Sequence, residues 1–399
     1  METTWNRRQF LQGCTVATAG CLLAAASENS VPTFRIGVIG HTGRGNYGHD
    51  LDFAWAHLPQ TEVVGIADPD PAGLVKRRDR LKAKSGFNDY RKMLHETQPD
   101  IVVICPRHAD QHCTMALAAI GAGARGIYLE KPFCRTLAEA DAIVAACEKR
   151  RVKCAVAHRM RTHPVVPRVE QLVRSGAIGR LLEVRGRGKE DDRGGAVDLW
   201  VLGSHVLNLA LVFTGAPVAC SGMLFKDGRP ATRADIFEGS DAVGKVAGNE
   251  LHARFETASK VPIFFDSVRG AGSPAAGWGL QLIGTTGTIN FRFDREPTAY
   301  LTVGNPFGIS LPAHNSVPIS TEGIGKPESI PDLETFFAHH VFAARDLLNA
   351  IERDKRPLCD AHDGRTNVEM VTAVFESHRL GGCRVPFPIP SRSNPIEAM

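Results

Sequence analysis

Short apolar runs alternate with helix-forming segments from residue 34 to residue 157. Runs of this length predict strands that are buried on both faces. Strands that alternate with helices predict a parallel sheet with helices on both sides. The expected strands cover residues 34–39, 62–67, 100–105, 126–129 and 153–157, and the expected helices cover 50–57, 74–84, 112–122 and 137–150. This part of the chain is therefore predicted to be a doubly wound α/β domain of the Rossmann type.

The pattern changes after Pro164, where strands follow one another in a block. They are expected at residues 181–187, 218–225, 246–255, 261–267, 280–284 and 288–293, with helices at 165–175 and 199–213, a loop over 304–331 and closing helices at 333–353 and 365–378. Such a block predicts an α+β domain with an open, mainly antiparallel sheet. A length of 399 residues also favours two domains. We expect a leader over 1–30, a Rossmann domain over 31–157, a substrate and oligomerisation domain over 158–332, and C-terminal helices and tail over 333–399.

A glycine-rich turn directly follows the first expected strand. A dinucleotide-binding turn needs a glycine where the strand bends, a small residue near the pyrophosphate and a glycine where the helix packs on the strand. Two registers compete, Gly40–Gly45 and Gly43–Gly48. We favour the first, because the phosphate-binding turn must come straight after the strand. Residues predicted to bind the cofactor here are Gly40, Thr42, Gly43, Arg44 and Gly45, and the Thr42 hydroxyl is placed to donate to phosphate.

Asp68 ends the second expected strand. A carboxylate at this position accepts hydrogen bonds from the ribose hydroxyls of NAD, so it favours NAD over NADP. Arg77 and Arg78 lie nearby on the next helix and leave NADP open. The alternative role for Asp68 is to cap that helix, just before Pro69.

The N-terminus carries the adjacent pair Arg7 and Arg8, followed by an apolar stretch from Cys14 to Ala26 that ends in three alanines. The stretch is too short to span a bilayer comfortably. It predicts a twin-arginine signal peptide, and hence export of the folded protein to the periplasm or the outside, without a stable membrane anchor. A frayed helix and a lipoprotein signal ending at Cys21 are the alternatives.

Three later segments add a more specific pattern: Cys105-Pro106 with His112 some residues on, Glu130-Lys131-Pro132, and Gly203-Ser204-His205 on an expected helix. Together with the closing helix over 373–381, they resemble the glucose-fructose oxidoreductase / inositol dehydrogenase (Gfo/Idh/MocA) family. The resemblance covers residues 34–388 in order and spacing. It implies an NAD(P)-dependent enzyme in which Pro106, His112, Glu130 and Lys131 contact the cofactor, and a homodimer or homotetramer formed through the open sheet.

Lys131 follows a strand at its carboxyl end, where a cation can stabilise the developing charge on a substrate oxygen. His205 is the predicted acid/base, because an imidazole suits proton transfer near neutral pH. The family usually has an aspartate four residues before this histidine, where this chain has Val201. Asp198 lies seven residues before His205, two helical turns away, and is the predicted replacement.

Arg159, Arg161 and His163 follow the last Rossmann strand and are predicted to bind a sugar or polyol; a solvated charge cluster is the alternative. The net charge of +4 and the lack of long basic runs argue against nucleic acid as a partner. The ten cysteines include no C-x-x-C pair, so no metal site is expected.

Three functions compete at this stage. The first is an NAD(P)-dependent oxidoreductase acting on a sugar, polyol or glycoside. The second is an NAD-dependent glycoside hydrolase that works through transient oxidation. The third is a non-catalytic sensor of sugar or cofactor. Retention of Lys131 and His205 favours an enzyme, whereas the missing carboxylate at Val201 favours the sensor.

Overall fold

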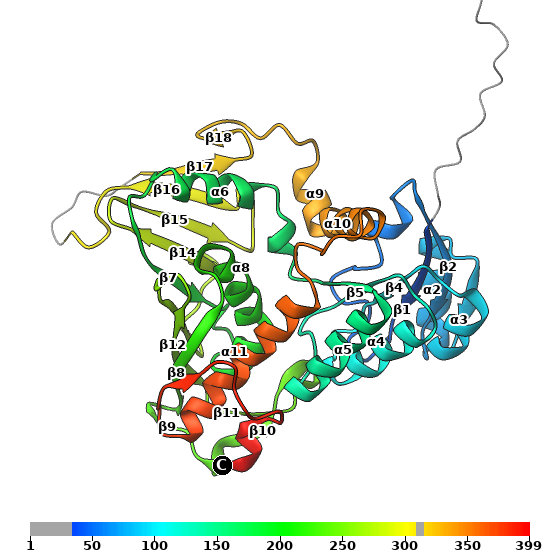
Figure 1. Ribbon diagram of the computed structural model, residues 1–399, viewed down its shortest axis with the longest axis horizontal. Helices are drawn as coiled ribbons and strands as arrows, with labels where there is room; N and C mark the ends of the chain where they lie inside the picture. Colours follow the sequence, from blue (N-terminus) through cyan, green and yellow to red (C-terminus); the bar gives the residue numbers. More distant parts are fainter. Residues whose placement is uncertain (1–33, 309–314) are drawn as a thin grey trace, which may run out of the picture. The chain divides into compact units, whose positions relative to one another are not determined.

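The computed structural model describes residues 34–308 and 315–399 (Figure 1). The expected signal peptide over residues 1–30, with Arg7 and Arg8, lies outside the described residues. Residues Phe34–Met399 form one compact unit.

The first sheet has six parallel strands in the order β3-β2-β1-β4-β5-β6. Its strands are β1 (Phe34–Ile39), β2 (Thr61–Ala67), β3 (Ser85–Phe87), β4 (Ile101–Ile104), β5 (Gly126–Leu129) and β6 (Lys153–Val156), and its helices are α2 (Pro71–Leu81), α3 (Tyr90–Thr97), α4 (His112–Gly121) and α5 (Leu137–Arg150). The order reverses between β1 and β4, the point at which doubly wound sheets bind their ligands. The predicted Rossmann sheet is confirmed; β3 and α3 were not predicted.

The prediction of a helix over residues 50–57 is wrong. Turns occupy this segment, and only the short 3-10 helix η1 (Ala54–Ala56) follows them. Asn46 and Asp50 both have positive φ, at 51° and 58°, which a helix does not allow. The loop instead buries Tyr47, Leu51 and Trp55 against the sheet, so packing decides its shape.

The C-terminal helix α10 (Val341–Glu352) covers part of the sheet face beside this loop. Its residues Val341, Ala344 and Leu347 share a buried cluster with Ile36 and Val38 of β1. Helices α3, α4 and α5 supply buried residues on the opposite face. The Rossmann core is therefore completed by a segment from the far end of the chain.

The second sheet has eleven strands and is antiparallel at every described pair except β7 with β13. Its path runs through β18 (Gly323–Ile324), β17 (Ser316–Ser320), β16 (Ala299–Val303), β15 (Gly287–Arg292), β14 (Gly279–Gly284), β7 (Leu181–Arg187), β13 (Ile263–Val268), β12 (Glu250–Thr257), β8 (Pro217–Lys226) and β19 (Val385–Pro386), with β9 (Arg229–Pro230) beside β8. The predicted open sheet is confirmed, but the predicted loop over 304–331 contains β17 and β18.

Helices α8 (Ser204–Thr214) and α11 (Ala361–Arg379) pack on this sheet, and α11 also packs against α5 (Figure 1). The remaining elements are α6 (Val165–Arg174), α9 (Leu333–Ala338) and a small ribbon of β10 (Ile236–Glu238) and β11 (Lys245–Ala247). The continuous helical segment Ala196–Thr214 is long and apolar enough to cross a membrane, but 78% of its most apolar window is buried inside the protein.

Candidate active site

Lys131 lies directly after β5, at the carboxyl end of the Rossmann sheet. Its side chain is buried, with Nζ 3.9 Å from a carboxylate oxygen of Glu130. Nζ also donates to the carbonyl oxygen of Val201, 3.3 Å away in the second domain. Val201 stands where the family usually has an aspartate, and its contact with the lysine ammonium is made by the backbone carbonyl.

His205 lies in the first turn of α8 and faces two aromatic neighbours. Its ring centroid is 5.1 Å from that of His158, at the end of β6, and 5.9 Å from that of Trp278. Burial lowers the pKa of His205 well below its ordinary value, and the Lys131 ammonium lowers it further. The imidazole is therefore neutral near pH 7 and able to accept a proton.

Glu130 and His158 complete the buried charge pattern. Burial alone would raise the pKa of Glu130, but the neighbouring His49 and Lys131 offset this and bring the pKa to about 2. Burial lowers the pKa of His158 to about 3, with the Lys131 ammonium contributing. Neither ring nitrogen of His158 has a hydrogen-bond partner among the described residues. His158 itself does not line the cavity described below, but its ring packs edge-on against that of His205.

Glu130, Lys131 and His205 line one cavity of about 280 Å³. Its polar and aromatic lining comes from both domains: His49, Arg107, Glu130, Lys131, Arg159, Lys189, Arg193, His205, Asp241, Trp278, Phe293, Asp294 and His340. The predictions for Glu130, Lys131, Arg159 and His205 thus converge on one place. Sequence reasoning missed His340, which begins α10 and whose Nδ1 lies 2.6 Å from the Tyr128 hydroxyl. It stands in no local motif, and only the packing of α10 on β5 brings it here.

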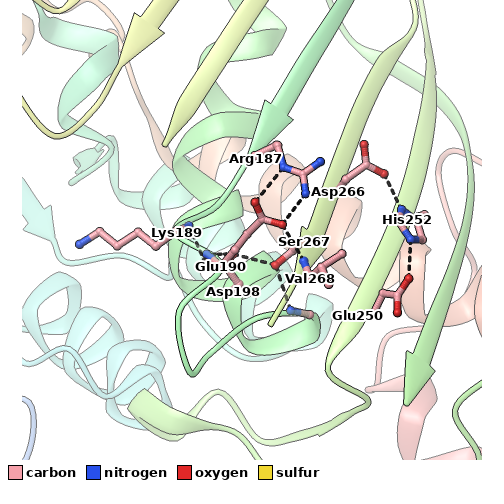
Figure 2. Close-up of polar contacts among 10 residues, drawn as sticks. Arg187, Lys189, Glu190, Asp198, Glu250, His252, Asp266, Ser267 and Val268 are labelled. Carbon is pink, nitrogen blue, oxygen red and sulfur yellow. Dashed lines mark hydrogen bonds and ion pairs between the residues drawn. The ribbon is translucent and has the colours of Figure 1, made fainter. Parts of the chain in front are cut away.

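The predicted contact between Asp198 and His205 is not formed. The Asp198 carboxylate accepts hydrogen bonds from the backbone of Lys189 and Glu190, at 3.3 Å and 3.1 Å, and from the Ser267 hydroxyl at 2.7 Å (Figure 2). The prediction assumed two regular α-helical turns. Residues Leu199–Gly203 (η4) form a π-helix instead, which widens the turn and rotates Asp198 off the face of His205.

Only Arg159 of the three predicted substrate residues lines the cavity, with its guanidinium stacked 4.6 Å from the Phe337 ring centroid. Arg161 donates to the carbonyl oxygens of Asn208 and Leu358, at 3.2 Å and 2.8 Å. His163 lies 2.9 Å from a carboxylate oxygen of Glu296. Arg161 and His163 therefore bind other parts of the chain outside the cavity.

His112 is fully buried, and its two ring nitrogens each lie 2.7 Å from a backbone carbonyl oxygen, of Pro106 and of Pro132. The ring ties together the loops that follow β4 and β5. The ring nitrogens of His112 are thus occupied by backbone carbonyls, while the predicted cofactor contacts of Pro106 and His112 stay a prediction.

In the glycine-rich turn, the polar groups expected to bind the nucleotide are hydrogen-bonded to other residues of the chain. Asp68 is fully buried and accepts from Thr42, through both its backbone N–H and its hydroxyl, and from the Tyr47 hydroxyl. The cap of α2 is Asp70, which accepts from Gly73, so the alternative capping role for Asp68 is not the one observed. Arg44 pairs with Asp110. In this conformation the turn does not fit the adenosine half of a dinucleotide, although the cavity at Lys131 remains open.

Comparison with known proteins finds similar sequences over parts of this chain. Residues 34–158 match the sequence model of the "Oxidoreductase family, NAD-binding Rossmann fold", which is the Gfo/Idh/MocA group. D-apiose dehydrogenase from Paraburkholderia graminis is 31% identical over 163 residues, 41% of this chain and 42% of that protein. Levoglucosan dehydrogenase from Pseudarthrobacter phenanthrenivorans is 26% identical over 329 residues, covering 70% of this chain and 80% of that protein.

The whole fold has solved counterparts. Levoglucosan dehydrogenase in complex with NADH and L-sorbose superimposes with a TM-score of 0.69 at 21% identity, over 90% of this chain and 99% of that one. At this identity the likeness shows the fold alone. The chain thus has the two-domain fold of this solved structure, and its residues 34–158 match a family model for NAD-binding Rossmann domains. The family model covers the Rossmann domain, and the match to levoglucosan dehydrogenase extends the sequence similarity beyond it.

Proposed function

We propose that the protein is an NAD-dependent oxidoreductase that acts on a sugar, polyol or glycoside. One observation carries the proposal: Lys131 from the Rossmann domain and His205 from the second domain line the same cavity. Both residues come from the segments that resemble the family's site.

The roles of the two residues follow from their surroundings. The Lys131 ammonium, held by Glu130 and the Val201 carbonyl, stabilises negative charge on the reacting oxygen. The neutral His205 accepts the proton of the substrate hydroxyl. NAD, when bound, supplies the hydride acceptor. His158 and Trp278 border His205 and limit the access of water to this proton transfer.

The substrate class is supported by the relatives, whose names include D-apiose and levoglucosan dehydrogenases. The matched region spans less than half of D-apiose dehydrogenase, so the activity belongs to the proposal. Asp68 favours NAD over NADP, because a carboxylate repels a 2′-phosphate. Calorimetric titration of both nucleotides checks this preference, and equal or tighter binding of NADP would contradict it.

A panel of sugars, polyols and glycosides, offered with NAD, tests the activity. The proposal expects NADH to accumulate with at least one of them. Release of an aglycone without NADH would instead identify the NAD-dependent glycoside hydrolase. Binding without turnover of any compound would identify the sensor.

The cellular setting and assembly are part of the proposal. The pair Arg7 and Arg8 supports twin-arginine export after folding, so that the cofactor is acquired before the protein leaves the cytoplasm. The open sheet supports a homodimer or homotetramer, because an uncovered sheet face favours association. Light scattering at micromolar concentration tests the assembly, and a monomer would refute it.

A further inference from the structure

We propose that residues 41–53 plug the adenosine half of the dinucleotide site, with Tyr47 as the latch, and that NAD binds only after this loop opens. The inference rests on the proposed NAD-dependent function. It arises from a difference between two parts of the expected nucleotide site. The polar groups of the turn are hydrogen-bonded within the chain, whereas the cavity at Lys131 and His205 is open.

The carboxylate of Asp68 has no acceptor position left for a ribose among its described contacts. Oδ1 accepts from the backbone N–H groups of Thr42 and Asp70, both at 3.0 Å. Oδ2 accepts from the Thr42 hydroxyl at 2.7 Å and from the Tyr47 hydroxyl at 2.9 Å. Two hydroxyls of the chain therefore make the bonds that the ribose diol of NAD would make with this carboxylate.

The backbone amides that would cradle a pyrophosphate are also engaged. Gly43 donates to the Asn46 side chain at 3.0 Å, and Arg44 and Asn46 both donate to the His41 carbonyl, at 3.0 Å and 2.9 Å. A phosphate-binding turn instead directs unpaired N–H groups at its ligand. The turn has closed upon itself as a hairpin.

Tyr47 holds the loop in this closed form. Its side chain is 2% exposed, and its ring lies so close to Gly40 that an added Cβ there would be 2.2 Å away. Arg77 stacks on the ring, 4.4 Å from its centroid, and is held in turn by Asp50 and Asp52 at 3.0 Å and 3.1 Å. The latch therefore consists of a packed aromatic ring and one hydrogen bond, from the Tyr47 hydroxyl to Asp68, which a ribose hydroxyl could replace.

The far end of the loop reaches the catalytic cavity. A Cβ at Gly48 would lie 2.6 Å from the Cys105 carbonyl oxygen and from the Glu130 carboxylate. His49 lies 3.6 Å from Glu130, at the rim of the cavity. Opening the loop would thus free Asp68 at one end and Glu130 at the other. The same movement would admit the nucleotide and expose Glu130 beside Lys131.

Removing the Tyr47 hydroxyl should favour the open loop. In Tyr47→Phe the ring still packs on Gly40, but a buried carboxylate loses a donor, and bonds to charged groups contribute substantially to stability. We expect NAD to bind about 3- to 30-fold more tightly, as calorimetry measures it. Tyr300→Phe, on the second sheet, is the matched control and should leave NAD affinity unchanged. Thermal melting checks that both variants are folded.

Binding kinetics distinguish the mechanism. If the loop must open first, the observed rate of NAD binding in stopped-flow fluorescence levels off at the opening rate, and Tyr47→Phe raises that plateau. Unchanged or weaker NAD binding by Tyr47→Phe would overturn the latch and leave the proposed function standing. No NAD binding by either the wild type or Tyr47→Phe would overturn both.

Discussion

The buried carboxylate of Asp198 joins three donors: Ser267 on strand β13, and Lys189 and Glu190 in the loop between β7 and α7 (Ala196–Asp198). All three donors belong to the chain itself, and the Lys189 side chain points away from Asp198 in Figure 2, so this carboxylate has a structural role. The sequence alone could not show this, because its distance from His205 was counted on a regular helix.

Asp198→Ala should therefore lower the free energy of unfolding by about 1–3 kcal/mol, the cost of leaving buried donors unpaired. Urea denaturation measures this loss, and Asp192→Ala, at an exposed neighbouring position, is the control. Unchanged stability with loss of activity would contradict the assignment and restore a direct role beside His205.

The buried histidines make stability depend on pH. The pKa of His158 falls from an ordinary 6.5 to about 3 on folding, and burial lowers that of His340 to about 3 as well. The unfolded chain then binds more protons, so the free energy of unfolding falls as pH decreases from about 6.5 towards about 3. His158→Gln should make this decline shallower in denaturation series at several pH values. An unchanged slope would show that His158 is not buried as a neutral ring.

At the scale of elements, the strands of the first domain were predictable because each is a continuous apolar run between turn residues. Strand β1 and helix α5 have the predicted bounds. The loop over residues 41–53 was not predictable. Its apolar residues Tyr47 and Leu51 have helical spacing, yet they are buried by a backbone with positive φ at Asn46 and Asp50. Strand β17 was missed because its glycine- and proline-rich surroundings are typical of loops.

The packing of the π-helix before His205 can be tested by substitution. Gly203 ends η4, and a Cβ there would lie 2.7 Å from the Phe265 ring in the sheet. Gly203→Ala should therefore shift α8, lower the free energy of unfolding by about 1–3 kcal/mol and reduce turnover.

Gly121→Ala in α4 is the control, because a Cβ there meets no atom within 4 Å. Denaturation and steady-state kinetics report the two effects of Gly203→Ala. Wild-type stability in Gly203→Ala would mean that Phe265 does not confine the backbone at this turn.

At the scale of the whole molecule, the sequence placed Lys131 and His205 in one cleft through the order of their motifs. It could not place His340, Trp278 or Lys189, which come from segments that meet only after α10 and the second sheet pack. The tertiary contacts, rather than local patterns, decide which polar groups face the substrate.

The proposed export is tested on the full chain. Replacing Arg7 and Arg8 by lysine should retain the precursor in the cytoplasm, because the paired arginines are the recognition feature. Fractionation of the exporting host measures this, and lysine replacement of Arg35 and Arg125 provides a charge-matched control. Normal export of the double Arg7/Arg8 variant would show that the signal is not of the twin-arginine type.

The central claim is that Lys131 and His205 perform an NAD-dependent oxidation in the cavity between the two domains. The most direct measurement is NADH formation by the wild type, Lys131→Met and His205→Ala with the best substrate of the carbohydrate panel, alongside NAD affinity. The account predicts that turnover falls about 10²- to 10⁴-fold in His205→Ala and about 10²- to 10³-fold in Lys131→Met, with NAD affinity nearly unchanged in His205→Ala. Full turnover in both variants would contradict it.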